Sequence, residues 1–428
     1  MKIAVIGAGF TGLSAGYQLA KLGNEVKIFE MDSAPGGLAL GYKEKEWEWS
    51  LEKHYHHWFT NDKFILGLAK QINHKVVIKK PKTSVYVDGN IYQFDSPKEV
   101  LMFPKLSIFD RLRMGAVIGL IKFDPFWKPL EKINATRFLP KTIGKKGYEM
   151  IWEPLFKNKF GPFAKDISLA WFWARIVKRT PSLAYPEGGF LSFANHLVKE
   201  IEQKNGKVLF NTAVLEISSN KKPQVLYKSA DKIELEDFDK VIVTLPSFLF
   251  LKIAKNLPKD YVDKFTRLRG LGATNLILRL NKPFFKDTTY WLSVCDPKSP
   301  IMAIVEHTNF MDNKNYNSEH LVYLGNYLTA DSERFGLNEE QTLKIFDPFL
   351  KKINPTYKDS LISYHLFKAP FAQPVIPTNY SKLIPSFDTP LSNVYLANIE
   401  QVYPWDRGTN YAVELGQKIV KHMFKDAD

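Results

Sequence analysis

The chain has 428 residues, of which 45% are hydrophobic and 14% aromatic, enough for two packed domains. Its formal net charge of +14 implies attraction to anions such as nucleic acid, acidic lipid or a phosphorylated substrate. No nucleic-acid-binding motif is present, so we expect no nucleic-acid partner. The one cysteine, Cys295, excludes an intramolecular disulfide and suits a reducing cytoplasm. The first predicted strand begins at the N-terminus, so we expect no signal peptide.

The N-terminal residues predict a nucleotide-binding turn. A short apolar strand over 2–6 leads into Gly7, Gly9 and Gly12. Gly7 suits a tight turn, Gly9 allows the backbone to approach a pyrophosphate, and Gly12 allows a helix to pack closely on the strand. The spacing therefore favours a dinucleotide-binding fingerprint over an ordinary glycine-rich turn.

A helix and a second strand complete this unit. Phe10 and Thr11 begin an amphipathic helix that stops at Gly23, and its free N–H groups face the phosphates. The strand 26–29 follows and ends at Glu30, about 20 residues beyond the glycines, where an acid binds a ribose 2′-hydroxyl. An unphosphorylated ribose, as in NAD or FAD, is expected.

A second glycine pair favours FAD over NAD as the cofactor. Gly36 and Gly37, followed by Leu38, lie in "MDSAPGGLALGY", and a simple NAD domain has no need of them. This run resembles the extended signature of the flavin amine oxidase, protoporphyrinogen oxidase and phytoene desaturase superfamily. The resemblance implies an α/β fold, with a Rossmann-like FAD-binding domain and a discontinuous α+β substrate domain.

Two later segments extend the resemblance. "YPEGGFLSFANHLVKEIEQKNGKVLFNTAVLEI" is similar to that family's return to the FAD domain, where a backbone amide near Val214 meets the adenine. "FDKVIVTLPS" resembles the next strand, and "NVYLANIEQVYPWDRGTNYAVELGQKIVKHM" the C-terminal flavin motif. Relatives usually carry Ala-Gly-Asp or a close variant where this chain has Ala397, Asn398 and Ile399. Asn398 is a candidate cofactor-binding residue, and Glu400 is a possible substitute for the ribityl-binding acid.

The loop 402–416 predicts a cradle for the flavin ring. A helix that begins near Thr409 to Tyr411 would point its positive end at the flavin pyrimidine and stabilise negative charge there. Gly408 lets the backbone pass close to the ring, and Thr409 or Asn410 is a candidate N-cap. A capped surface helix is the alternative interpretation.

Three histidines surround a tyrosine in "SLEKHYHHWF". His54, Tyr55 and His56, together with Arg407 of the C-terminal loop, are the candidate catalytic residues. Imidazole relays protons near neutral pH, and His54 and His56 share a face if the segment is extended. A surface cluster including His57, or a weak metal site, is the alternative; ligand spacing typical of metal sites is absent, so we predict no metal.

The segments between the FAD motifs predict a second domain. A hairpin turns at Asp88-Gly89, mostly helical residues follow, and strands in 247–384 are expected to form an antiparallel sheet over the flavin. The predicted division assigns 1–62, 183–246 and 385–428 to the FAD-binding domain, and 63–182 and 247–384 to the substrate domain.

Polar side chains on otherwise apolar segments are candidate substrate ligands. Tyr290, Trp291, Glu306 and His307 are expected to line a cavity, and Arg175 is suited, like Arg407, to binding a phosphate or carboxylate. A structural role is the alternative for each.

The apolar run 114–121 is too short to span a bilayer and is bracketed by basic residues. An interfacial helix, which would make the protein peripheral to a membrane, and a buried helix both remain open.

The sequence therefore predicts an FAD-dependent oxidoreductase that takes a hydride from a C–N or C–C bond of a small or lipid-like substrate. Cys295 lies in the predicted substrate domain, so we expect noncovalent FAD, although the histidines near residue 55 leave a histidyl linkage open. A non-redox flavoenzyme of the sugar-nucleotide mutase type and an FAD-stabilised binding protein are the alternatives. The substrate, the electron acceptor and the oligomeric state stay open.

Overall fold

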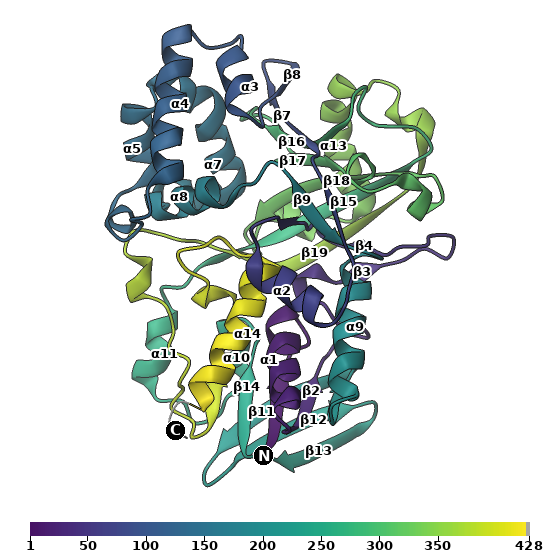
Figure 1. The fold of residues 1–428 in the computed structure, drawn as a ribbon, viewed down its shortest axis with the longest axis vertical. Coiled ribbons are helices and arrows are strands. Elements are labelled where there is room, and N and C mark those ends of the chain that lie inside the picture. The colour runs from purple at the N-terminus through teal and green to yellow at the C-terminus, as the bar shows by residue number, and fades with distance from the viewer. Residues whose placement is uncertain (425–428) are drawn as a thin grey trace.

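A computed structural model describes residues 1–424 of the chain. Figure 1 shows a parallel sheet with helices in its lower half, where both ends of the drawn chain lie. The upper half holds a group of helices on one side and a large sheet on the other. The fold is therefore mixed α/β, as predicted.

The lower half contains a five-stranded parallel sheet assembled from three distant parts of the chain. Its strands run in the order β10 (Gly206–Leu209), β2 (Glu25–Phe29), β1 (Lys2–Ile6), β14 (Lys240–Val243) and β20 (Val394–Leu396). The central strand β1 is an apolar run that is almost entirely buried, as expected for a parallel strand covered on both faces. Its core packs against α1 (Phe10–Lys21), α9 (Phe190–Glu202) and α14 (Thr409–Met423).

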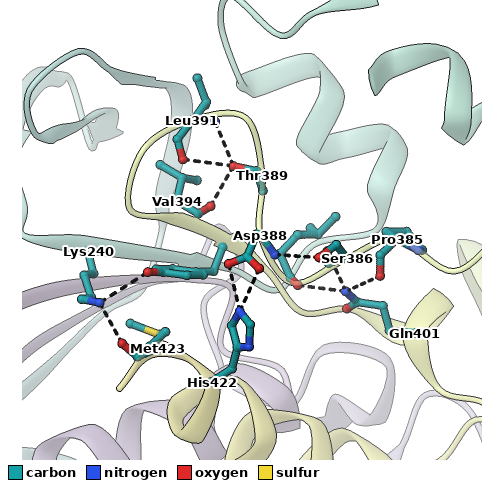
Figure 2. Close-up of polar contacts among 12 residues, drawn as sticks. Lys240, Pro385, Ser386, Asp388, Thr389, Leu391, Val394, Gln401, His422 and Met423 are labelled. Atoms are coloured by element: carbon teal, nitrogen blue, oxygen red, sulfur yellow. Dashed lines mark hydrogen bonds and ion pairs between the residues drawn. The ribbon is translucent and has the colours of Figure 1, made fainter. Parts of the chain in front are cut away.

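Side chains fix the C-terminal helix to this sheet, as Figure 2 shows. Lys240 of β14 donates to the main-chain oxygen of Met423 at 2.9 Å, near the negative end of α14. His422 lies 2.9 Å from the carboxylate of Asp388. Beyond the sheet, β11 (Thr212–Ser219), β12 (Pro223–Ser229) and β13 (Lys232–Asp237) form an antiparallel meander.

The strands of 247–384 pair antiparallel in the large sheet of the upper half, as expected, and the added strand β7 (Lys82–Val87) makes the whole sheet mixed. It contains β19 (Leu361–Pro374), β15 (Gly270–Leu280), β18 (His320–Leu328), β17 (Ala303–Glu306), β16 (Thr289–Val294), β7 and β8 (Asn90–Gln93), in that order. The hairpin at Asp88-Gly89 is confirmed, and its strand β7 pairs with β16 in parallel. Helix α13 (Glu339–Ile353), which the predicted strands did not include, packs on this sheet.

The helical group forms a second core with the sheet. Its members are α3 (Pro97–Met102), α4 (Ile108–Phe123), α5 (Ala135–Thr142), α6 (Lys145–Gly147), α7 (Glu153–Phe160) and α8 (Leu169–Lys178). Lys122 of α4 donates to the main-chain oxygens of Ile176, Val177 and Arg179, which satisfies carbonyls at the end of α8. Within residues 1–424, no helix is both long and apolar enough to cross a bilayer.

Short elements connect these parts. They are β3 (Gly41–Tyr42), β4 (Leu51–Glu52), β5 (Trp58–Phe59), α2 (Lys63–Gln71), β6 (Val76–Lys79), β9 (Leu183–Pro186), α10 (Ser247–Ile253), α11 (Lys259–Phe265) and α12 (Glu333–Gly336). Strand β9 pairs with both β5 and β6. We keep the predicted division into five segments as a proposal.

Candidate active site

The two predicted glycine loops lie side by side. Gly36 donates its N–H to the main-chain oxygen of Ala8 at 3.0 Å, and Gly9 and Gly36 form an isolated parallel bridge. Gly37 has a φ of +58°, and a Cβ there would lie 3.1 Å from the Cα of Gly9. Residues separated by almost thirty positions therefore form one glycine-lined surface.

The glycines of this surface are needed for different reasons. A Cβ at Gly12 would lie 1.9 Å from the main-chain oxygen of Gly7, so the fold itself requires this glycine. Gly9 has a φ of −69°, and its Cβ would meet only the Cα of Gly37, at 3.8 Å. Protein packing does not require a glycine at position 9, whereas a pyrophosphate approaching the backbone does. The loop thus fits a dinucleotide cofactor.

The neighbouring predicted residues support this surface in different ways. Phe10 and Thr11 are buried at the start of α1, where the Phe10 ring stacks on the ring of Phe193. Glu30 accepts the N–H of Ala8 at 2.7 Å, which ties its carboxylate to the glycine loop. Burial raises the pKa of Glu30, and the N–H bonds that it accepts oppose this effect.

Strand β11 begins beside Glu30. The N–H of Thr212 donates to the main-chain oxygen of Glu30 at 2.8 Å, which joins the start of β11 to the end of β2. Val214 lies two residues further along β11, and its contact with the adenine stays a prediction.

Helix α14 begins at Thr409, as predicted, but its N-cap is Gly408. The prediction that Thr409 or Asn410 caps it is wrong, because their side chains accept hydrogen bonds from elsewhere. Thr409 Oγ1 accepts from Trp58 Nε1 at 2.8 Å. Asn410 Oδ1 accepts from two main-chain N–H groups in the first turn of α2, at 3.0 and 3.2 Å. Among residues 1–424 no side chain caps α14, so its first N–H groups are not bonded by a capping side chain of the described chain.

The polar side chains that follow strand β20 form hydrogen bonds within the protein. Asn398 donates to the main-chain oxygen of Leu245 and to Ser247 Oγ, at 3.1 and 3.0 Å. Glu400 accepts the N–H of Ser247 at 2.9 Å, and burial raises the pKa of Glu400. Both candidate ribityl ligands are therefore held in one buried network.

A small cavity opens between the second glycine loop and the large sheet. Its lining includes residues predicted from the sequence, namely Leu38, His54, Tyr55, His56 and Arg407. Sequence reasoning missed the residues that the sheet contributes, namely Ala273, Asn275, Asn326, Tyr327 and Ala372.

The two histidines of this cavity have opposite hydrogen-bonding roles. His56 Nδ1 donates to the main-chain oxygen of His54 at 2.6 Å, which leaves its Nε2 as an acceptor. Asn275 Nδ2 donates to His54 Nδ1 at 2.6 Å, so the His54 proton is on Nε2. Burial lowers the pKa of His56 to about 4 and that of His54 to about 3. Both imidazoles are therefore neutral near pH 7.

Of the predicted substrate ligands, Trp291 and Tyr290 lie directly behind the cavity wall. The Trp291 ring packs edge-on against Tyr55, with the ring centroids 4.8 Å apart. His57, whose pKa burial lowers to about 3, lies 3.1 Å from the hydroxyl of Tyr290.

Glu306 and His307 lie in the core instead. Glu306 accepts the main-chain N–H groups of Phe284 and Phe285, at 3.0 and 2.9 Å. His307 Nε2 lies 2.8 Å from the Tyr316 hydroxyl, and burial lowers the pKa of His307 to about 3. The structure does not bring these two residues to the cavity lining.

Asp406 connects the side chain of Arg175 with the loop that carries Arg407. Arg175 donates to Asp406 at 2.7 Å, which forms an ion pair. Arg407 donates to Gln373 Oε1 at 3.0 Å and to the hydroxyl of Tyr327. The C-terminal loop thus carries one guanidinium into the cavity wall and fixes a second beside it.

A buried carboxylate near the histidines was also missed. Glu52 accepts hydrogen bonds from the hydroxyl of Tyr185, at 2.7 Å, and from the N–H of Phe190, at 2.9 Å. Burial raises the pKa of Glu52 to about 7, although both bonds oppose this effect. A single glutamate two residues before His54 forms no pattern from which the burial of its carboxylate could be predicted.

Comparisons with known proteins identify relatives in sequence and in structure. The chain is 23% identical over 298 residues to the all-trans-retinol 13,14-reductase of Danio rerio, which covers 60% of this chain and 49% of that protein. It thus spans about half the length of the curated relatives it matches. Putrescine oxidase bound to putrescine has a similar structure, with a TM-score of 0.75, 15% identity and 99% of each chain covered. Reduced UDP-galactopyranose mutase has a TM-score of 0.76 at 16% identity, covering 99% of this chain and 95% of that one.

A family model described as flavin-containing amine oxidoreductase matches residues 10–401, which is most of the chain. Flavin is therefore the cofactor class of this protein. The chain belongs to the flavin-containing amine oxidoreductase family.

Proposed function

We propose that the protein is an FAD-dependent oxidoreductase that takes a hydride from a C–N or C–C bond of a small or lipophilic substrate. The observation that supports this most is the cavity, because Leu38 joins it to the glycine loops while neutral histidines face it. A bound flavin supplies the hydride acceptor. The chain's own residues must then orient the substrate and take up its proton.

The histidine pair suits proton transfer. His56 Nε2 carries a free lone pair and accepts a proton, while His54 Nε2 carries a hydrogen and donates one. The main-chain oxygen of His54 and the amide of Asn275 hold the two rings in these tautomers. We propose that His56 takes the substrate proton and that His54 passes protons onward.

The remaining residues position the cofactor and keep it noncovalent. The N-terminus of α14 is suited to stabilising negative charge on the flavin pyrimidine. Cys295 lies in the core of the helical group and large sheet, and burial raises the pKa of its thiol. A thiol that stays protonated is a poor nucleophile for attachment.

Anaerobic stopped-flow absorbance tests this function. Amines, retinoids and other polyprenyl lipids, porphyrinogens and sugar nucleotides are added separately to the flavin-loaded protein. We expect one class to bleach the flavin band. If none does, while dithionite-reduced protein converts a sugar nucleotide without net oxidation, the oxidoreductase proposal fails.

That outcome would establish the second candidate, a non-redox flavoenzyme of the sugar-nucleotide mutase type. Two arginines near the cavity favour it, because guanidinium groups bind phosphates in bidentate geometry. Turnover without any electron acceptor is its signature.

We also propose that α4 binds a membrane surface peripherally. Leu112, Leu120 and Phe123 are 55%, 73% and 85% exposed, whereas only Met114 and Ile121 of this helix are buried. Exposed apolar side chains on a basic protein suit the interface of an anionic bilayer.

Co-sedimentation with vesicles of phosphatidylserine and phosphatidylcholine checks this proposal. The Leu120→Glu/Phe123→Glu variant should lose binding. Leu22→Glu should keep it, because Leu22 is the exposed C-cap of α1, a helix in the lower half of Figure 1, whereas α4 lies in the upper half. Equal binding of both variants would contradict a membrane role for α4.

A further inference from the structure

The residues in and next to the cavity wall carry more positive than negative charge. Arg407 lines the cavity, and Lys159 Nζ lies 4.6 Å from the ring centroid of the lining residue Tyr327. Arg175 lies beside them, over the ring of Trp171. One carboxylate, that of Asp406, accompanies these three cations in the contacts that the structure gives them.

Asp406 is already fully engaged. It accepts hydrogen bonds from Arg175 at 2.7 Å, from Trp171 at 3.2 Å, from Gln373 at 3.3 Å and from the N–H of Arg407 at 3.1 Å. The Arg407 guanidinium itself contacts only neutral groups, the amide of Gln373 and a tyrosine hydroxyl. Its charge therefore has no direct counterion among residues 1–424.

Lys159 is in the same situation. In the described part of the chain its ammonium forms neither a hydrogen bond nor an ion pair, and it faces the rings of Tyr327 and Trp171. Burial lowers the pKa of Lys159 well below its usual range; Asp406 opposes this, and Arg175 and Arg407 add to it. Lys159 and Arg407 are both half-buried. An anion in the cavity would neutralise cations that are partly withdrawn from water.

Two side-chain amides that line the cavity each have one atom without a hydrogen-bond partner among the described residues. Asn275 and Asn326 are 3% and 7% exposed and line the cavity. Asn275 Oδ1 and Asn326 Nδ2 have no hydrogen-bond partner among the described residues. Buried polar atoms without partners are rare in folded proteins, so these two indicate a polar ligand independently of the charges.

We propose that the cavity binds an anionic group of the substrate, a carboxylate or a phosphate, through Arg407 and Lys159. Asn275 and Asn326 then bond polar atoms next to that group. This inference rests on the proposed function, whose substrate class it narrows. A substrate whose only charge is a protonated amine would meet like charge beside the cavity.

Isothermal titration of the flavin-loaded protein with four benzene derivatives of similar size tests the proposal. Benzoate and phenyl phosphate carry the two anionic groups, benzamide is neutral and benzylamine is cationic. We expect at least one anion to bind about ten-fold or more tightly than benzamide, as one hydrogen bond to a charged group requires, and benzylamine to bind most weakly. The anion that binds more tightly shows whether the cavity prefers a carboxylate or a phosphate.

Variants locate the binding site. Arg407→Gln and Lys159→Met should each weaken anion binding about ten-fold and leave benzamide binding unchanged. Lys157→Met is the matched control, because Lys157 is on the same helix but exposed and paired with Glu153. Flavin content and the unfolding temperature are recorded for every variant, so that a folding defect in Arg407→Gln leaves Lys159→Met as the test.

Several results would overturn the proposal. One is equal affinity of the protein for benzoate, phenyl phosphate and benzamide, and another is tightest binding of benzylamine. A third is that neither anion binds at concentrations up to about 10 mM. The last is a Lys159→Met variant that loses flavin but keeps its anion affinity. These titrations need no turnover. Failure to find a substrate that bleaches the flavin would count against the oxidoreductase function alone.

Discussion

Replacing Gly9 by alanine separates what the fold needs from what the cofactor needs. Gly9 has a φ of −69° and a ψ of 171°, which alanine adopts freely, and the added Cβ would meet only the Cα of Gly37 at 3.8 Å. The free energy of unfolding should therefore change by no more than about 0.5 kcal/mol, or rise slightly because the unfolded chain loses freedom.

FAD binding should respond differently. The same methyl group would occupy the space through which the pyrophosphate approaches the backbone of Gly9. Crowding a tight contact by one methyl group costs roughly 1–3 kcal/mol, which weakens FAD binding roughly 5- to 150-fold. Fluorescence titration of the apoprotein with FAD gives the dissociation constant, and chemical denaturation of the same apoprotein gives its stability.

Gly12→Ala is the matched control. Its Cβ would lie 1.9 Å from the main-chain oxygen of Gly7, so the fold should lose about 3 kcal/mol or more before any cofactor is considered. A Gly9→Ala protein that binds FAD as tightly as the wild type, or that unfolds like Gly12→Ala, would refute the assignment of this loop to the pyrophosphate.

Three further substitutions test other parts of the site. His56→Ala should slow flavin reduction about 10²-fold without changing FAD affinity. In the wild type, the rate of flavin reduction should decline only as the pH falls through about 4, which is the pKa of His56. A decline centred on the ordinary histidine pKa would contradict this role. The pKa of Glu52 rises from 4.5 to about 7 on folding, so its stabilising contribution of about 3 kcal/mol is complete below pH 4.5 and is lost as the pH rises through 7. Glu52→Gln should flatten urea-unfolding stability over that range, and an unchanged pH dependence would exclude Glu52. Thr409→Val should cost about 1–3 kcal/mol of stability, because it removes the acceptor of the buried Trp58 N–H, whereas Thr409→Ser should not.

Local signals made the cofactor side predictable. The strand over residues 2–6, the glycines that follow it and the start of α14 at Thr409 depend on spacing within a few residues, and each stands where expected. The hairpin at Asp88-Gly89 was predictable for the same reason, because the turn residues themselves determine it.

Long-range packing determined the rest. Asn410 was expected to cap its own helix, yet its side chain bonds the first turn of α2, almost 350 positions away. Lys159, Asn275 and Asn326 carry no motif. Two sheet strands bring the two asparagines to the cavity, and the docking of α7 places Lys159 against the lining residue Tyr327. Glu306 was expected at the cavity because it is polar on an apolar strand, but two main-chain N–H groups hold it in the core.

The most direct measurement is the cofactor content of the purified protein before and after acid precipitation. We expect a flavin absorbance band in the native protein and about one FAD per chain, identified by mass spectrometry, in the supernatant after precipitation. A colourless protein that takes up no added FAD would contradict the flavin site itself, and a yellow pellet would contradict noncovalent binding.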